Sequence, residues 1–308
     1  MTEPSLVLPD AIRTQWPYRP RFARVNGWRM HYVDEGAGDP VVLLHCNPTW
    51  GFLYRDFVGP LPRTGHRVII PDMIGFGLSE KPAREDAHSL DGHIATLTAL
   101  LRGLDLTRIT LVCHDWGGPT GLGFALSNLA RVRALVLMST WAWPLPPAEF
   151  HTHLFPWRMM HADGRALSDG PAQCTGHARH LSLGRRPRAL SRTGTGRLRS
   201  GDARPCEPAP DLDLAALDPA RSGRARARAF RLARQLAACK LPALLAWGRE
   251  DDVFDHATFT TRFKQLLPHA EGPHLVTGRP FPAGGFRVGD RGAHRRFSQT
   301  LGANGARS

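Results

Sequence analysis

The stretch LVCHDWGG at residues 111–118 combines a carboxylate with the pattern of a sharp turn between a strand and a helix. Asp115 takes the position of a nucleophile elbow, where the reactive side chain stands on the turn itself. Gly117 and Gly118 allow the helix and the strand to approach closely. Asp is also a common helix N-cap, and taken alone that interpretation is the stronger one. The other polar segments of the chain decide between the two.

Three further polar segments each follow an apolar run whose pattern predicts a strand. They are HCNPTWGFLYR at 45–55, DMIGFGLSEKP at 72–82 and WGREDD at 247–252. Chemistry in parallel α/β sheets gathers at the carboxyl ends of strands, so all these segments are expected at one edge of the sheet. Taken singly, each also has an ordinary interpretation: an Asx turn at Asn47, a core aromatic at Trp116 and a solvated acidic loop at 250–252.

Together these motifs resemble the haloalkane dehalogenase family of α/β-hydrolases. The resemblance rests on H-x-N-P-T-W, on D-x-x-G-x-G-x-S-x-K-P and on HDWGG, and it covers about residues 25–160 and 240–271. It implies an α/β-hydrolase fold, a mostly parallel sheet flanked by helices with an inserted cap domain. It also implies that the Asp115 carboxylate attacks a carbon bearing halogen and forms an alkyl ester, which water later cleaves at the ester carbonyl. No cofactor and no metal is implied.

The resemblance also implies roles for the residues beside the nucleophile. The backbone N–H groups of Asn47 and Trp116 would form the oxyanion hole for ester hydrolysis. The Asn47 amide and the Trp116 indole would hydrogen-bond the departing halide, because both are uncharged donors. Cys46 stands where the family usually has Gly. His45 and His114 flank the site and are interpreted as structural.

The acid that orients the base histidine is matched by Asp251, with Asp252 as the alternative. The base itself is missing from the sequence as written. The family carries it in an A-G-H-F-type motif, and here the corresponding region reads EGPHLVTGRPFPAGG at 271–285, with Pro280 at the expected place. His274 comes too early, and its neighbours do not match the motif. Without a base, the ester should form and then stall.

The elements that must position these residues follow from apolar periodicity. Strands are expected at 22–34 (two, around an Asn-Gly turn), 41–45, 67–72, 109–115, 132–139 and 242–248, with helices at 88–104 and 117–129. The alternation of buried strands and helices predicts a parallel sheet covered on both faces. We divide the chain into a first core part at 1–143, a cap region at 144–240, a second core part at 241–271 and a C-terminal segment at 272–308.

The formal net charge of +13 is concentrated in two segments. Residues 162–240 carry 16 basic and 7 acidic side chains, residues 272–308 carry 6 and 1, and the remainder carries 18 and 19. The first segment has no Val, Ile, Met, Trp or Tyr, the residue types that build cores. Binding of nucleic acid by arginines needs interleaved aromatic side chains, which are almost absent here, so that function is disfavoured.

A shifted reading frame accounts for both segments. Codons that encode residues 272–297 can be chosen so that the same DNA, translated one nucleotide out of frame, gives VHTLSRAGHFLQED…EIAAHIADF. That sequence contains the missing A-G-H-F motif. Residues 163–219 likewise recover the absent Tyr, Val, Met and Trp. We therefore predict that about 162–230 and 272–308 are out of frame. The cap would then be disrupted and the base lost, leaving an inactive chain or a non-functional remnant.

The nearest alternative function is epoxide hydrolysis, which uses the same aspartate together with cap tyrosines. The tyrosines of this chain, Tyr18, Tyr32 and Tyr54, all precede the cap, which disfavours it. Five cysteines without a C-x-x-C pair, no long apolar run and an acidic N-terminal stretch favour a cytoplasmic protein. We expect a monomer whose partners are a small halogenated organic substrate and halide, with neither nucleic acid nor membrane.

Overall fold

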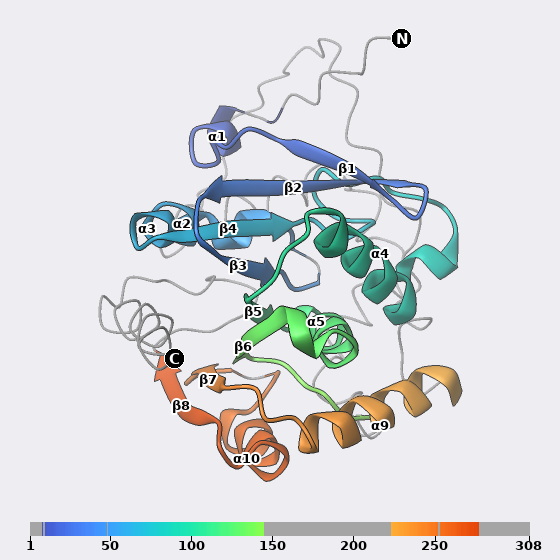
Figure 1. Cartoon of the computed structure of the whole chain (residues 1–308), viewed down its shortest axis with the longest axis vertical. Helices are drawn as coiled ribbons and strands as arrows, with labels where there is room; N and C mark the ends of the chain where they lie inside the picture. The colour runs from blue at the N-terminus through green and yellow to red at the C-terminus, as the bar shows by residue number, and fades with distance from the viewer. Residues whose placement is uncertain (1–7, 9, 48, 145–222, 252, 277–308) are drawn as a thin grey trace, which may run out of the picture.

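The computed structural model describes residues 8, 10–47, 49–144, 223–251 and 253–276. Their strands form one sheet in the order β1-β2-β4-β3-β5-β6-β7-β8 (Figure 1). The strands are β1 Arg21–Val25, β2 Trp28–Gly36, β3 Asp39–Leu44, β4 His66–Pro71, β5 Ile109–His114, β6 Val132–Met138, β7 Ala243–Gly248 and β8 Glu271–Val276. Pairing is antiparallel at β1–β2 and β2–β4 and parallel from β4 to β8, so the α/β-hydrolase architecture expected from the sequence is confirmed.

Helices cover both faces of this sheet. They are α1 Asp10–Arg13, α2 Arg55–Val58, α3 Pro60–Arg63, α4 Leu90–Gly103, α5 Gly117–Ser127, α9 Gly223–Ala237 and α10 His256–Leu266, with short 3-10 turns η1 Gly51–Tyr54, η2 Glu85–His88 and η3 Leu129–Arg131. One apolar core lies between the sheet and α4, α5, α9 and α10, and a second lies against α1, η1, α2 and α3. Alternate residues of one strand serve the two cores: Leu111 faces the first and Val112 the second.

The elements predicted from periodicity are present, with small differences at their ends. The Asn26-Gly27 turn has positive φ at both residues, +49° and +91°, which suits the two-residue connection of β1 to β2. Helix α4 begins after Ser89, whose hydroxyl accepts the Gly92 N–H at 3.0 Å as an N-cap. Strand β8, the short helices α1, α2 and α3, and the helices α9 and α10 were not predicted in the written frame.

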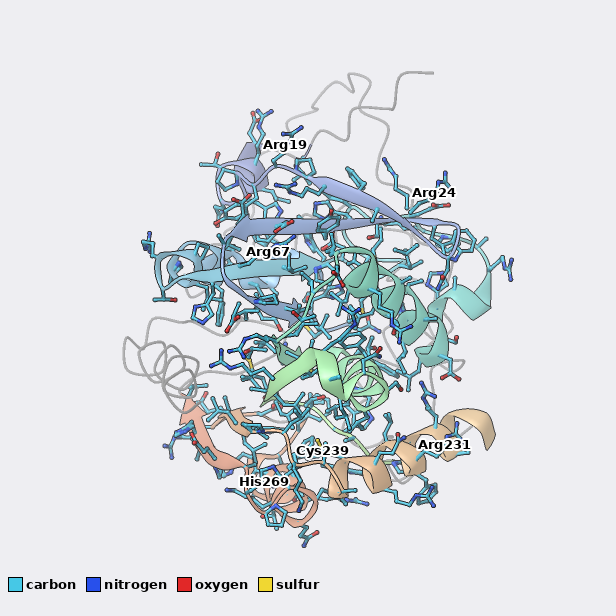
Figure 2. The ribbon with its side chains drawn as sticks, viewed as in Figure 1. Arg19, Arg24, Arg67, Arg231, Cys239 and His269 are labelled. Atoms are coloured by element: carbon cyan, nitrogen blue, oxygen red, sulfur yellow. The ribbon has the colours of Figure 1, made fainter. Side chains whose placement is uncertain are left out.

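Helix α9 lies at the end of the predicted cap region, and its first half falls within the segment predicted to be out of frame. Its buried residues Ala229, Leu232 and Leu236 recur at helical spacing, and the helix packs against α5 and α10. Arg231, labelled in Figure 2, and Arg234 are exposed. A low-complexity arginine–alanine sequence therefore still presents one apolar face to the core.

Some predictions fall outside the described residues. These are the out-of-frame cap up to residue 222, the alternative acid Asp252, and the C-terminal segment after residue 276, including Pro280. No helix in the described part of the chain is both long and apolar enough to cross a membrane.

Candidate active site

Asp115 stands between β5 and α5 in a backbone conformation that side chains rarely adopt. Its φ is +51°, the left-handed region, which is strained for a residue other than glycine. Three hydrogen bonds hold this conformation: the Asp115 N–H donates to the Ser139 carbonyl at 3.0 Å, and the Asp115 carbonyl accepts from the Gly118 N–H at 2.8 Å and the Thr140 hydroxyl at 2.7 Å. The turn is therefore fixed from the segment that follows β6 as well as from its own helix.

The two glycines after the elbow are required by close packing. A Cβ on Gly117 would lie 2.4 Å from the Leu44 carbonyl oxygen, and one on Gly118 would lie 1.7 Å from the Thr140 hydroxyl oxygen. Any side chain at either position would push α5 away from the sheet. This is the close helix–strand approach that the GG pair indicated in the sequence.

The Asp115 carboxylate accepts hydrogen bonds from two backbone N–H groups. Its Oδ1 lies 3.1 Å from the Asn47 nitrogen, which belongs to the loop after β3. Burial raises the pKa of Asp115 to about 7, against the opposing effect of hydrogen bonds from the Trp116 and Asn47 N–H groups, and the Asp251 charge raises it further. The structure thus brings Asp115, Asn47, Trp116 and Asp251 together at the carboxyl edge of the sheet.

Aromatic rings lie beside Asp115. Trp116 is half-buried and meets Trp141 edge to face, with ring centroids 5.0 Å apart. Trp141 in turn stacks on Phe254 at 5.4 Å, in the loop after β7. The ordinary interpretation of Trp116 as a core aromatic is therefore partly right, since one edge packs on the core while the residue keeps some exposure.

Asp251 is buried in the turn after β7. Its Oδ1 accepts the N–H groups of Val253 at 3.0 Å and Phe254 at 2.8 Å, and the Trp247 indole N–H donates to the Phe254 carbonyl at 2.8 Å. A solvated acidic loop, the ordinary interpretation of this run, does not describe a residue that is 7% exposed. Asp251 therefore organises its own turn and also acts electrostatically on Asp115.

His274 lies within β8, where it pairs with Ala246 of β7, ahead of the end of that strand at Gly248. His274 is half-buried and makes no hydrogen bond or ion pair with any described residue. The structure therefore does not join His274 to Asp251 or to Asp115. The place where the sequence pattern expects the base, Pro280, is outside the described residues.

The two flanking histidines are buried. The His45 Nδ1 lies 2.9 Å from the Cys46 carbonyl oxygen, and its Nε2 accepts the Met73 N–H at 2.9 Å. Burial lowers the pKa of His45, and it lowers the pKa of His114 to about 4. Both rings are therefore neutral at pH 7.

Asp72 has a structural role that was not predicted from the sequence. Its carboxylate is fully buried and accepts from the Gly51 N–H, the Leu78 N–H and His31 Nδ1, each at 2.8 Å. Burial alone would raise its pKa, but the His31 charge and these hydrogen bonds hold it below the usual value. The D-x-x-G-x-G spacing was a sequence signal for this role, because the second glycine makes room for the carboxylate. A Cβ on Gly77 would lie 2.1 Å from Asp72 Oδ2.

A parallel sheet with a strained acidic elbow after its central strand defines an α/β-hydrolase. The chain matches the alpha/beta hydrolase fold family over residues 39–281 and belongs to that family. It is an enzyme by family.

Its relatives confirm the resemblance to haloalkane dehalogenases. The chain is 34% identical over 260 residues to haloalkane dehalogenase 2 of Mycobacterium tuberculosis, with 82% of this chain and 85% of that protein covered. It is 34% identical over 274 residues to a cis-3-alkyl-4-alkyloxetan-2-one decarboxylase of Shewanella oneidensis, with 84% and 82% covered.

Solved structures confirm the fold. A tetrameric haloalkane dehalogenase of Paraglaciecola agarilytica matches with a TM-score of 0.65 at 22% identity, over 86% of this chain and 89% of that one. An epoxide hydrolase of Vigna radiata matches with a TM-score of 0.62 at 21% identity, over 93% and 97%.

Proposed function

We propose that this site cleaves carbon–halogen bonds. The Asp115 carboxylate displaces halide from an sp3 carbon, so that one C–O bond forms, one C–halogen bond breaks and the halide leaves with the electron pair. The Asn47 amide and the Trp116 indole hydrogen-bond the departing anion. The observation that carries the proposal is the carboxylate at the strained elbow, with its Oδ1 at 3.1 Å from the Asn47 nitrogen.

The second step is hydrolysis of the Asp115 ester. Water would add to the ester carbonyl, and the negative oxygen would be held by the N–H groups of Asn47 and Trp116. A base must take the proton of that water, and Asp251 is the acid that would orient it. Because His274 is not joined to Asp251, we propose that the reaction of this chain stops at the Asp115 ester.

Stoichiometry tests this proposal directly. The chain is mixed with a primary bromoalkane, and both released bromide and intact protein mass are followed. We expect about one bromide per chain, a mass increase by one alkyl group, and no continuing alcohol formation. Asp115→Asn should show neither signal. Sustained alcohol production, or alkylation that persists in Asp115→Asn, would contradict the proposal.

Epoxide hydrolysis is the alternative from the sequence, and the tyrosines count against it. The Tyr54 hydroxyl is buried and donates to the Leu44 carbonyl at 2.8 Å. Tyr32 lies on β2, and the Tyr18 ring packs against Trp16 at 5.0 Å. Diol formation from an epoxide matched in chain length to the bromoalkane would favour this alternative.

Decarboxylation of an oxetan-2-one is a second candidate, because the Shewanella oneidensis relative is named for that activity and is 34% identical. Such a substrate would lose CO₂ and leave an alkene. Measurement of CO₂ and alkene from a dialkyl oxetan-2-one, beside bromide release from the bromoalkane, separates the two activities on the same protein.

We also propose a cytoplasmic monomer whose partners are the substrate and halide, without nucleic acid or membrane. Support comes from Cys46, Cys113 and Cys239, which are free and buried, as a reducing compartment favours. Sedimentation tests the monomer against the tetramer of the Paraglaciecola agarilytica structure.

A further inference from the structure

The peptide group between Cys46 and Asn47 is held from its carbonyl side. Its N–H is the one that donates to Asp115 Oδ1 at 3.1 Å. Its C=O accepts three hydrogen bonds: from His45 Nδ1 at 2.9 Å, from the Thr49 hydroxyl at 3.1 Å and from the Thr49 N–H at 3.0 Å. A carbonyl oxygen has two lone pairs, so this acceptor is fully used.

His45 can serve only as a donor to that carbonyl. Its Nε2 accepts the Met73 N–H at 2.9 Å, so the ring proton is on Nδ1, facing the Cys46 oxygen. The ring is 1% exposed, and it lies against Phe76 with centroids 5.3 Å apart. Met73 follows Asp72 directly, so the 72–82 loop fixes both the tautomer and the position of the imidazole.

Thr49 is held in turn by Cys46, which stands where the family usually has Gly. The Cys46 sulfur lies 3.0 Å from the Thr49 hydroxyl oxygen, and both residues are buried. Because the Thr49 hydroxyl donates to the Cys46 carbonyl, it retains lone pairs that accept the thiol proton. The thiol therefore orients the hydroxyl toward the carbonyl.

We propose that His45 and Thr49 are positioning residues that aim and polarise the Asn47 N–H toward the Asp115 carboxyl group. Donors on the carbonyl of a peptide strengthen its N–H as a donor, because hydrogen bonds in a chain polarise one another. They also fix the peptide plane, so the N–H stays directed at Asp115 when the carboxylate becomes an ester. This inference rests on the proposed role of Asp115.

Paired variants separate this role from simple loss of packing. His45→Asn keeps a donor near the Nδ1 position, whereas His45→Gln places its amide near Nε2 instead. Thr49→Ser keeps the hydroxyl and Thr49→Val removes it. Thr96→Val is the matched control, because buried Thr96 also donates to backbone carbonyls but lies on α4.

The first measurement is the infrared carbonyl stretch of the Asp115 ester in protein labelled with side-chain ¹³C-aspartate, taken as alkylated minus free protein. A weaker Asn47 donor raises the stretching frequency. We expect a higher frequency in His45→Gln and Thr49→Val, and the wild-type frequency in His45→Asn, Thr49→Ser and Thr96→Val. The time to cleave the ester with hydroxylamine, followed by intact mass, should lengthen about tenfold in the first pair only.

An unchanged band and an unchanged cleavage rate in folded His45→Gln and Thr49→Val would overturn the inference, as would an equal change in Thr96→Val. If the wild-type chain forms no ester, the proposed function fails, but the inference is still tested. The same ¹³C label reports ionisation of the free Asp115 carboxyl group, and its pKa should rise in His45→Gln and Thr49→Val but not in Thr96→Val. Identical titrations in all variants would then overturn it.

Discussion

The loops after β3, β4 and β5 differ sharply from the loop after β7 and from strand β8. In the first region, Asp115, the Asn47 N–H, His45 and Asp72 belong to one connected set of buried and part-buried hydrogen bonds. In the second region, the buried acid Asp251 accepts the Val253 and Phe254 N–H groups, and among the described residues His274 of β8 is not joined to it. In the proposed mechanism, alkylation of Asp115 needs only the first region, whereas hydrolysis of the ester needs both. The comparison therefore predicts a protein that performs the first step and not the second.

The two regions also differ in how their strands are buried. Every residue of β5 is buried, whereas no residue of β8 is: all are half-exposed or exposed. Strand β8 lies at the edge of the sheet and is paired only with β7 among the described strands. The segment predicted to carry the base therefore begins on a poorly covered strand, whereas Asp115 directly follows a fully buried one.

The largest effect should come from breaking the first region at its centre. Asp115→Asn keeps the size of the side chain and its hydrogen-bond acceptor but removes the attacking charge. Bromide release and the mass increase from a bromoalkane should both disappear. Asp39→Asn, at the opposite edge of the sheet, should retain both signals. Bromide release that persists in Asp115→Asn would show that another residue is the nucleophile.

Repairing the second region should convert a single turnover into many. Residues 162–230 and 272–308 are replaced by the sequences read one nucleotide over, which supply the A-G-H-F motif. Ester hydrolysis should accelerate by about 10²–10⁴-fold, the usual contribution of a general base. Alcohol formation over time is the measurement, and Asp115→Ala in the repaired chain should abolish it. A repaired chain that still releases one halide would refute the shifted-frame hypothesis.

The pH dependence of the single-turnover halide release, called the burst below, tests the environment of Asp115. Only ionised Asp115 attacks, and burial raises its pKa to about 7. The alkylation rate should therefore be constant well above pH 7 and fall about tenfold per pH unit well below it. Stopped-flow halide release between pH 5 and pH 9 measures this. A rate that is flat down to pH 5 would mean a carboxylate with an ordinary pKa.

The helix that follows the loop after β4 should also be sensitive to acid. His93 is buried on α4, and burial lowers its pKa from 6.5 to about 3. The native state thus binds fewer protons than the unfolded state, so its stability is complete above pH 6.5 and falls as pH drops from 6.5 toward 3, by at most about 1.4 kcal/mol per unit. His93→Leu should flatten this fall in urea unfolding. An equally steep fall in that variant would assign it to other groups.

The sequence predicts the first region better than the second for a physical reason. Local signals were strong where glycines and polar residues follow apolar strands, as in HDWGG and the Asn26-Gly27 turn. Helix α10 was missed although Asp255 caps it, accepting the Thr258 N–H at 2.8 Å, and Phe259 and Phe263 are buried at helical spacing. The buried role of Asp72 was missed because it depends on His31 and Gly51, which only the tertiary fold brings together.

The smallest predicted effect tests the electrostatic link between the two regions. The Asp251 charge raises the pKa of Asp115. Asp251→Asn removes that charge, while its amide oxygen still accepts the Val253 and Phe254 N–H groups that Oδ1 accepts now.

The midpoint of the burst in Asp251→Asn should therefore shift to lower pH, by a fraction of a unit, with an unchanged plateau at high pH. Asp255→Asn is the matched control. Asp255 lies in the same loop, and its carboxylate caps α10, so this change should leave the midpoint in place. A shift to higher pH, or an equal shift in both variants, would mean that Asp251 acts on Asp115 through the shape of its turn rather than through its charge. A shift in Asp251→Asn alone would show that the charge of Asp251 acts on Asp115.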